Sequence, residues 1–76
     1  MEELMEILKK IKPEVDFETE TDLIEDGLLE SFEMLQIIAR IKDTFCIEVK
    51  PSRIVPENFA SAEAMWNMIN DIMENE

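Results

Sequence analysis

Apolar residues recur with the spacing of a helix at the start of the chain. Over residues 2–12 they stand three and four positions apart, at Leu4, Ile7, Leu8 and Ile11. Residues spaced in this way fall on one face of an α-helix. Acidic residues open the segment and lysines close it, which complements the helix dipole. Pro13 disfavours a helical conformation in the residue before it, so the pattern predicts an amphipathic helix that ends at Pro13.

A second helical pattern covers residues 32–45. A rotation of about 100° per residue places Met34, Leu35, Ile38, Ile41 and Phe45 in one sector of the helix. Ile37 lies at the edge of this sector. The opposite sector is polar and holds Glu33, Gln36, Arg40 and Asp43. Phe32 and Ala39 fall among or beside the polar positions, and Leu35 lies at the margin nearest to them. We therefore expect Phe32, Leu35 and Ala39 to form an exposed apolar edge.

A third helix is predicted over residues 62–73, with Ser61 as its N-cap. Its core stripe consists of Met65, Met68, Ile69 and Ile72, and Trp66 lies at the margin of this stripe. Residues 47–49 alternate like a strand but have no partner strand nearby, so we interpret them as an extended connector. Residues 51–55 fit a single helical turn, which Pro56 ends.

The segment from residue 14 to residue 30 has no sustained periodicity. Apolar residues are scattered through it and predict a loop pinned to the core: Val15, Phe17, Leu23, Ile24, Leu28 and Leu29. The whole pattern predicts an all-α fold class and a single domain over residues 1–76. The expected architecture is a small helical bundle of three main helices, with a short helix before the last and a long loop between the first two.

The chain is strongly acidic. Nineteen Asp and Glu residues against seven Lys and Arg residues give a formal net charge of −12. Such a chain lacks the clustered cations that bind nucleic acid. It is suited instead to basic patches on partner proteins, and we expect a monomer. The repulsion among its carboxylates predicts that added salt stabilises the fold.

Cysteine and histidine content excludes several kinds of chemistry. A single cysteine, Cys46, cannot form an internal disulfide, and its neighbours Phe45 and Ile47 predict a buried free thiol. Without histidine, Ser–His and Cys–His catalytic pairs are impossible, so we expect no enzyme activity. The acidic N-terminus and the lack of an apolar run of about 20 residues predict a cytoplasmic protein without a membrane span.

Ser31 directly precedes the second helical pattern. Gly27, the only glycine, predicts a tight turn, from which Leu28, Leu29 and Glu30 lead to the serine. One interpretation makes Ser31 only an N-cap, since a serine oxygen accepts a backbone N–H of the first turn. A second interpretation follows from the positive end of the helix dipole, where free N–H groups suit a phosphate on the serine.

The sequence around Ser31, EDGLLESFEML, resembles the attachment site of acyl carrier proteins. The resemblance extends over nearly the whole chain, through the order of the helices, the acidic charge and the PENFASAEAM run before the last helix. Carrier proteins commonly have Asp-Ser-Leu where this chain has Glu30-Ser31-Phe32. The GLLxSF form is similar to D-alanyl carriers and to freestanding acyl or peptidyl carriers, and the PENFASAEAM run is similar to acyl and peptidyl carriers.

This resemblance implies that Ser31 carries a 4′-phosphopantetheine arm, donated by coenzyme A through a phosphopantetheinyl transferase. The arm would hold an acyl or aminoacyl group as a thioester, supplied by a loading ligase and passed to downstream transferases with basic docking patches. Fatty acid, polyketide and nonribosomal peptide synthesis are the pathways such carriers serve. Gln36, Arg40 and Lys42 dilute the acidic second helix that is typical of fatty-acid carriers, which favours a dedicated pathway.

Nine residues near Ser31 or beyond the second helix are candidates for partner binding: Glu30, Phe32, Glu33, Leu35, Ala39, Arg40, Asp43, Arg53 and Ile54. The alternative function is an acidic helical adaptor that binds a partner protein and is never modified. In that case the same fold is expected and Ser31 serves only as a cap.

Overall fold

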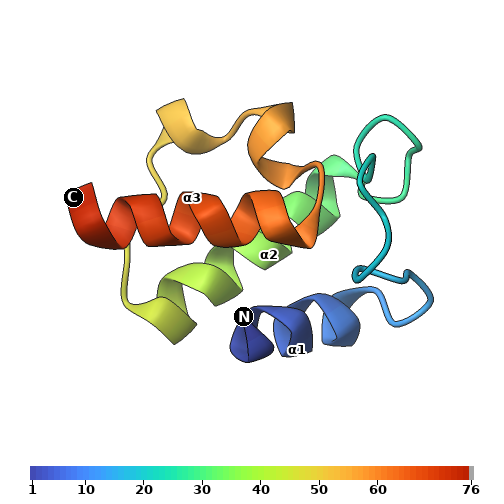
Figure 1. Ribbon diagram of the computed structural model, residues 1–76, viewed down its shortest axis with the longest axis horizontal. Helices are drawn as coiled ribbons and strands as arrows, with labels where there is room; N and C mark the ends of the chain where they lie inside the picture. Colours follow the sequence, from blue (N-terminus) through green and yellow to red (C-terminus); the bar gives the residue numbers. More distant parts are fainter. Residues whose placement is uncertain (76) are drawn as a thin grey trace.

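The computed structural model describes residues 1–75 and contains three α-helices and two short 3₁₀ helices in that range. The α-helices are α1 (Glu2–Ile11), α2 (Ser31–Phe45) and α3 (Ala62–Asn75), and the 3₁₀ helices are η1 (Pro51–Arg53) and η2 (Pro56–Phe59). No strand occurs among these residues, which confirms the all-α class. Figure 1 shows α3 across the front, α2 crossing behind it and α1 below.

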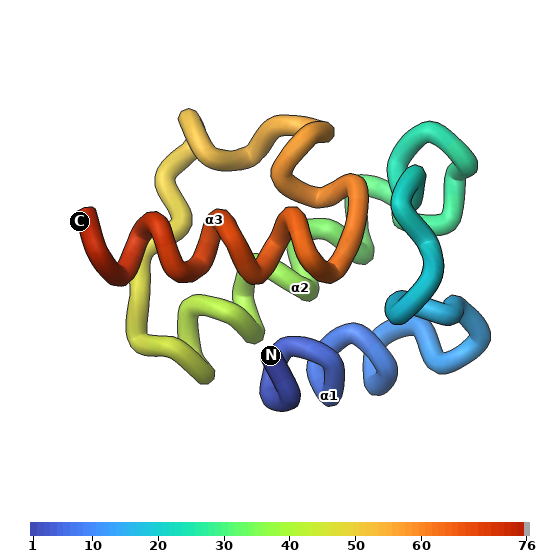
Figure 2. Tube along the Cα trace, viewed as in Figure 1, coloured from blue at the N-terminus to red at the C-terminus, as the bar shows by residue number. Residues whose placement is uncertain are grey.

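The two 3₁₀ helices lie along the side of α3 away from α1, and the long loop closes one end of the molecule (Figure 2). Apolar side chains from every helix except η1 meet in one core, whose largest fully buried members are Leu4, Leu8, Leu23, Ile37, Ile41, Phe59, Met65 and Ile69. The Cα radius of gyration is 11.3 Å. A compact chain of this length is expected at about 11 Å, so the loop does not extend away from the body.

Residues 12–30 form a loop that is anchored at several points, as the sequence predicts. Val15, Phe17, Leu23 and Leu29 are buried in the core. The Leu23 backbone N–H also donates to the carbonyl oxygen of Ala60, at 2.9 Å. This bond ties the loop to the segment that leads into α3.

The ends of the helices follow the local signals in the sequence. The Lys12 backbone N–H donates to the Leu8 carbonyl at 2.9 Å and α1 stops before Pro13, while Ser61 Oγ accepts the Ala64 N–H at 3.0 Å at the start of α3. These two predictions are confirmed. The expected end of α3 at residue 73 is wrong, because the helix continues to Asn75, whose side-chain amide donates to Asp71 Oδ1 at 2.7 Å.

The core face of α2 is rotated from the sector predicted for it. Ile37, placed at one edge of the apolar sector, is fully buried, whereas Leu35, placed at the margin nearest the polar positions, is 63% exposed. The cause is α1, which packs against α2 on the side that carries Glu33 and Arg40, and Ile37 lies between these two residues on the same side of the helix. The Leu35 side has no such cover in the part of the chain that the structure describes.

Two further predictions are corrected after the end of α2. Cys46 is exposed rather than buried: it follows the last helical residue in the left-handed conformation, with φ of 55°, and Sγ turns away from the core. Pro56 does not simply end a helical turn, since its fixed φ suits a helix start and it begins η2. The connection therefore holds two 3₁₀ helices instead of one short helix, and the α-helices number three over residues 1–75.

Candidate functional site

The turn before Ser31 fixes the direction in which the chain enters α2. Gly27 has a φ of +71°, in the left-handed region where a side chain causes strain, and its N–H donates to the Ile24 carbonyl at 3.1 Å. The N–H groups of Leu28 and Leu29 both donate to the Leu23 carbonyl, at 2.9 and 3.1 Å. Leu29 is buried, so the chain is held in the core two residues before Ser31.

Ser31 is the first residue of α2 and its side chain is exposed. The interpretation that makes Ser31 the N-cap is wrong by one position, because Glu30 occupies the cap, with extended backbone angles (φ −97°, ψ 167°). Its N–H donates to Glu33 Oε1 at 2.9 Å. Because carboxylates supply the capping contact, the serine hydroxyl is not used for it.

Lys12, at the C-terminal end of α1, holds the carboxylate of Glu33, which belongs to the capping box of α2. Lys12 Nζ lies 2.7 Å from Glu33 Oε2, and both side chains are about one-fifth exposed, at 19% and 18%. The Lys12 ammonium, followed by the Glu30 backbone N–H, lowers the pKa of Glu33 below its ordinary value. In turn Glu33, with smaller contributions from Glu14 and Glu30, raises the pKa of Lys12. The first turn of α2 is thus fastened to the end of α1.

An exposed stripe runs along α2 from Ser31. Phe32 is 69% exposed and Leu35 is 63% exposed, and Ala39 follows on the same side of the helix. This confirms the predicted apolar edge as a surface feature. Asp43, one turn further on, is also exposed on this side.

Three other candidate residues lie away from that stripe. Arg40 lines a shallow hollow with Glu3 and Glu6 of α1 and so faces a different side of α2. Arg53 Nη1 lies 2.5 Å from Asp71 Oδ2, which joins η1 to α3. Ile54, directly after η1, is 37% exposed.

The structure therefore gathers only part of the predicted set around Ser31. Glu30, Phe32 and Leu35 surround the serine on the exposed side of α2, and Glu33 lies beneath it on the α1 side. Lys12 was not among the predicted site residues. It lies 21 positions from Glu33 in the sequence (33 − 12 = 21), and only the folding of α1 onto α2 brings the two together.

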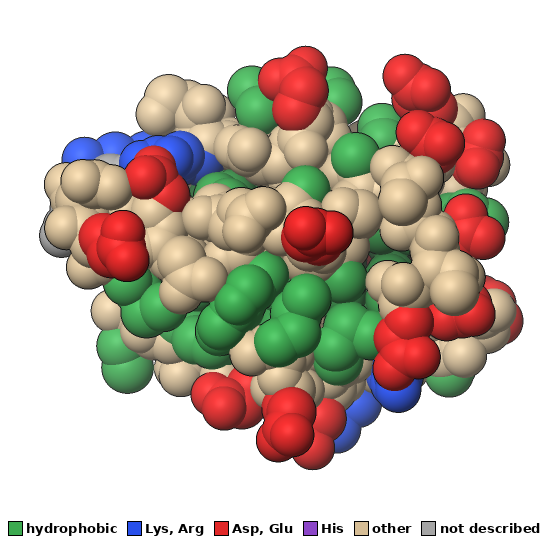
Figure 3. All heavy atoms as spheres, viewed as in Figure 1, with side chains coloured by type: hydrophobic (Ala, Val, Ile, Leu, Met, Phe, Trp, Pro, Cys, Tyr) green, Lys and Arg blue, Asp and Glu red, His purple; other side chains and the backbone are tan. Residues whose placement is uncertain are grey.

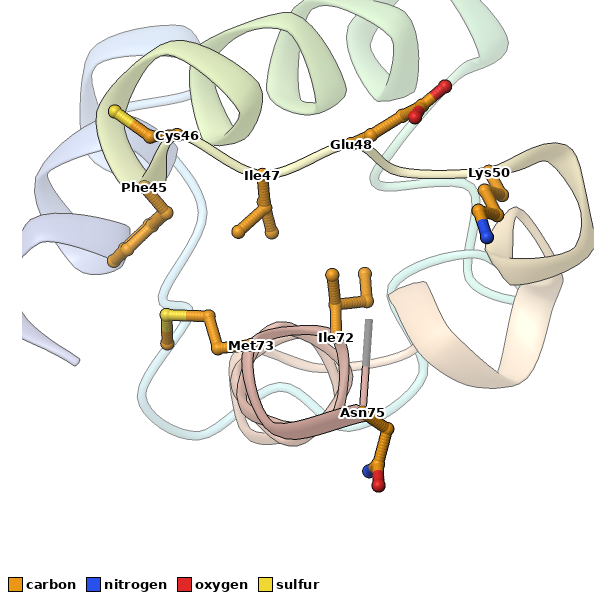
Figure 4. Close-up of a pocket in the computed structure, with 8 residues that line it drawn as sticks. All are labelled: Phe45, Cys46, Ile47, Glu48, Lys50, Ile72, Met73 and Asn75. Carbon is orange, nitrogen blue, oxygen red and sulfur yellow. The ribbon is translucent and has the colours of Figure 1, made fainter.

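A groove of about 700 Å³ lies at the other end of α2 (Figure 4). Phe45, Ile47, Ile72 and Met73 line it together with Glu48 and Lys50, and the Cys46 thiol points away from it. A helix of fifteen residues rises about 22 Å from end to end. The groove is therefore remote from Ser31.

The chemistry available around Ser31 is that of an exposed serine without a histidine beside it. The chain has no histidine, and the two carboxylates that flank Ser31 in the sequence, Glu30 and Glu33, take part in the capping box, where Lys12 also holds Glu33. No group of three or more metal-binding side chains is found within residues 1–75, and no helix there has the length and hydrophobicity to cross a membrane. Such a hydroxyl is suited to receiving a group that another protein activates.

Comparisons of the chain with models of protein families, with curated proteins and with solved structures yield no match.

Proposed function

We propose that this chain is a carrier protein that holds an acyl or aminoacyl group on a 4′-phosphopantetheine arm attached to Ser31. The observation that carries the proposal is the exposed Ser31 hydroxyl at the first position of α2, two residues after the buried Leu29. The EDGLLESFEML sequence, with its resemblance to acyl carrier proteins, supports the same function. In this role the chain presents a substrate to other enzymes and performs no catalysis itself.

The residues around Ser31 fit a phosphodiester. A helix N-terminus favours an anion, because the dipole and the backbone N–H groups of the first turn act together. Two carboxylates, Glu30 and Glu33, would oppose that charge, but Lys12 lies against Glu33 and offsets it. The local field is therefore less negative than the sequence of the α2 start suggests.

The loading step requires Ser31 Oγ to attack the phosphorus of coenzyme A that bears the pantetheine arm. A P–O bond forms to the serine oxygen, the bond between the two phosphates breaks, and adenosine 3′,5′-bisphosphate leaves. The serine proton passes to a base on the transferase, since the chain has no histidine to take it. Once attached, the arm supplies a terminal thiol on which the cargo is held as a thioester.

The exposed stripe on α2 supplies a surface by which such enzymes would recognise the carrier. Phe32 and Leu35 offer apolar contact area next to Ser31, and Glu30 and Asp43 offer charges for a basic patch. Complementary charges mainly accelerate encounter and set orientation, while apolar contacts slow dissociation.

Intact-mass measurement tests the proposal. The purified chain is incubated with coenzyme A, Mg²⁺ and a transferase of broad specificity, and its mass should rise by one phosphopantetheine group. The chain has three serines, so Ser31→Ala should abolish the rise while Ser52→Ala and Ser61→Ala retain it. A mass that stays constant in every reaction would favour the unmodified adaptor instead.

A further inference from the structure

A second exposed surface lies along α3, on a different part of the molecule from the α2 stripe. Figure 3 shows hydrophobic side chains in a band along the lower edge of α3, with acidic side chains above and below it. On α3 itself, Ala62, Trp66 and Met73 share one face, because they are four and seven residues apart. Ala62 is buried and Met73 is 47% exposed, so this face of α3 is buried at its N-terminal end and exposed to solvent toward its C-terminal end.

The other two α-helices extend this surface on both sides. Phe45, at the end of α2, meets Trp66 edge to face, with ring centroids 5.8 Å apart and planes at 61°. Phe45 and Met73 then line the groove of Figure 4 together. At the opposite end, Met5 of α1 and Ala62 line a hollow of about 320 Å³. We call this surface, made of Met5, Phe45, Trp66 and Met73, the α3 band.

The α3 band consists of residue types that are common at binding surfaces. Tryptophan, phenylalanine and methionine are enriched in protein interfaces, and methionine adapts to partners of different shape. Trp66, Phe45 and Met5 are half-buried, which leaves part of each side chain in contact with water.

Charges around the α3 band determine which partner fits it. Glu18 and Glu63 line the hollow beside Met5, and Glu48 lines the groove beside Met73, where Lys50 is also present. With a net charge of −12 on the chain, the surrounding field attracts a cationic partner. A second copy of the chain would bring the same −12, so electrostatic repulsion opposes self-association through this surface.

We propose that the α3 band binds a positively charged amphipathic helix of a partner protein. The distance from Ala62 to Met73 along α3 is about 16 Å, which matches roughly three turns of a helix. The partner helix would place an apolar stripe against Trp66 and Met73, with Lys or Arg on its flanks toward Glu18, Glu63 and Glu48. This interaction is separate from the proposed arm on Ser31 and does not require it.

A designed peptide tests the proposal with the Ser31→Ala chain, so that no phosphopantetheine is involved. The probe is a stapled helix of roughly four turns with Leu at positions i, i+3, i+4 and i+7 and Lys elsewhere. Controls are a Leu/Lys peptide of the same composition with scrambled order, and a peptide with Glu in place of Lys. The affinity is measured by titration calorimetry, and the emission of Trp66, the only tryptophan, reports contact at the α3 band.

The ordered Leu/Lys helix should bind with a blue shift of the Trp66 emission and should bind more tightly than both control peptides. Met73→Glu should weaken binding roughly tenfold, and Leu35→Glu, at a more exposed apolar position on α2, should leave it unchanged. Circular dichroism verifies that both variants are folded, and Met73→Ala replaces Met73→Glu if that variant is not. Equal binding of the scrambled peptide, an unchanged affinity in the Met73 variant, or a loss in Leu35→Glu would overturn the proposal.

Sedimentation equilibrium of the peptide-free chain, at low and at moderate salt, tests whether a second copy of the chain binds the α3 band instead. A monomer in both conditions is expected. A dimer that Met73→Glu dissociates would assign the α3 band to a second copy of the chain and would overturn the proposal.

Discussion

Lys12 Nζ lies 2.7 Å from Glu33 Oε2, and Glu33 Oε1 accepts the backbone N–H of Glu30. One carboxylate, that of Glu33, therefore takes part in the capping box of α2 and also binds the lysine at the end of α1. The serine proposed to carry the arm stands between Glu30 and Glu33 in the sequence, so its orientation depends on this contact.

Replacing Lys12 with Met should raise the pKa of Glu33 toward its ordinary value, because the ammonium is the largest cause of the lowered pKa. Since the folded pKa of Glu33 lies below the unfolded one, its contribution to stability is present above the unfolded pKa. That contribution is lost as the pH falls through the folded pKa. The variant should therefore lose less stability on acidification, as measured by denaturant unfolding across the acid range.

The side-chain carboxyl carbon of Glu33, followed by NMR against pH, gives the pKa directly. Lys9→Met, which removes a lysine of α1 that no described contact joins to Glu33, is the matched control. A Glu33 pKa that is identical in the Lys12 variant and in the wild type would contradict the contact.

The rotated core face of α2 makes a second prediction. Ile37→Val should destabilise the fold by ~0.5–1.5 kcal/mol, because it removes a methylene from a fully buried site. Leu35→Ala removes a larger group but should change stability by no more than about 0.5 kcal/mol, since Leu35 is 63% exposed. Urea unfolding of the two variants provides the measurement. A larger loss of unfolding free energy in Leu35→Ala than in Ile37→Val would show that the buried face of α2 is the sector predicted from the sequence.

The parts of the fold that could be predicted from the sequence are those that a residue determines within its own segment. Pro13, Gly27 and Ser61 each act on their own segment, and the helix end, the turn and the cap lie where these residues predict. The buried face of α2 is different, because it depends on where α1 packs. The helical wheel places Leu35 and Ile37 on the two margins of one apolar sector, and only the neighbouring helix decides which margin is covered.

The candidate site was predictable to a similar extent. The sequence pattern places Ser31 at the start of α2 and Phe32 and Leu35 on its exposed side, and the structure agrees. It does not disclose that Lys12 neutralises Glu33, since ion pairs between distant segments leave no local periodicity. Arg53, grouped with the partner-binding residues, is joined to Asp71 of α3 by a contact of the same long-range kind.

Loading of Ser31 should depend on the exposed stripe of α2. Phe32→Ala should lower kcat/KM for transfer of the arm roughly tenfold, because a large apolar contact beside the serine is lost. Helical content should not change, since Phe32 is 69% exposed. Steady-state kinetics with a transferase of broad specificity measures the effect, and Met73→Ala is the control from a remote exposed site. Equal kcat/KM in the wild type, Phe32→Ala and Met73→Ala would show that Phe32 is not part of the docking surface. The loop before Ser31 would then be the next region to test.

Salt should stabilise the fold at neutral pH. Because 19 acidic and 7 basic residues leave −12 on a small body, screening by about 0.5 M NaCl should raise the melting temperature. Glu25→Gln, in the exposed loop, should give part of this gain at low salt, and Lys10→Gln should have the opposite sign. A melting temperature that does not respond to salt would show that ion pairs such as Lys12–Glu33 already offset the critical repulsion.

Exposure of Cys46 is a further testable difference from the sequence-based expectation. The thiol should react with a colourless aromatic disulfide reagent in the native state at a rate close to that of a free thiol in the unfolded chain, because Cys46 lies outside the core at the end of α2. The released chromophore is followed by absorbance. Protection of the native thiol by several orders of magnitude would show that the side chain is buried.

The bond between the Leu23 N–H and the Ala60 carbonyl has a consequence for the order of events during synthesis. The loop that leads to Ser31 is closed by a residue that the ribosome adds long after the serine itself. A nascent chain that ends before Ala60 contains all of α2 but lacks the carbonyl that accepts the Leu23 N–H, so the loop before Ser31 has one anchor fewer. The proposed arm would then be attached most readily once Ala60 is in place and this bond holds the loop before Ser31.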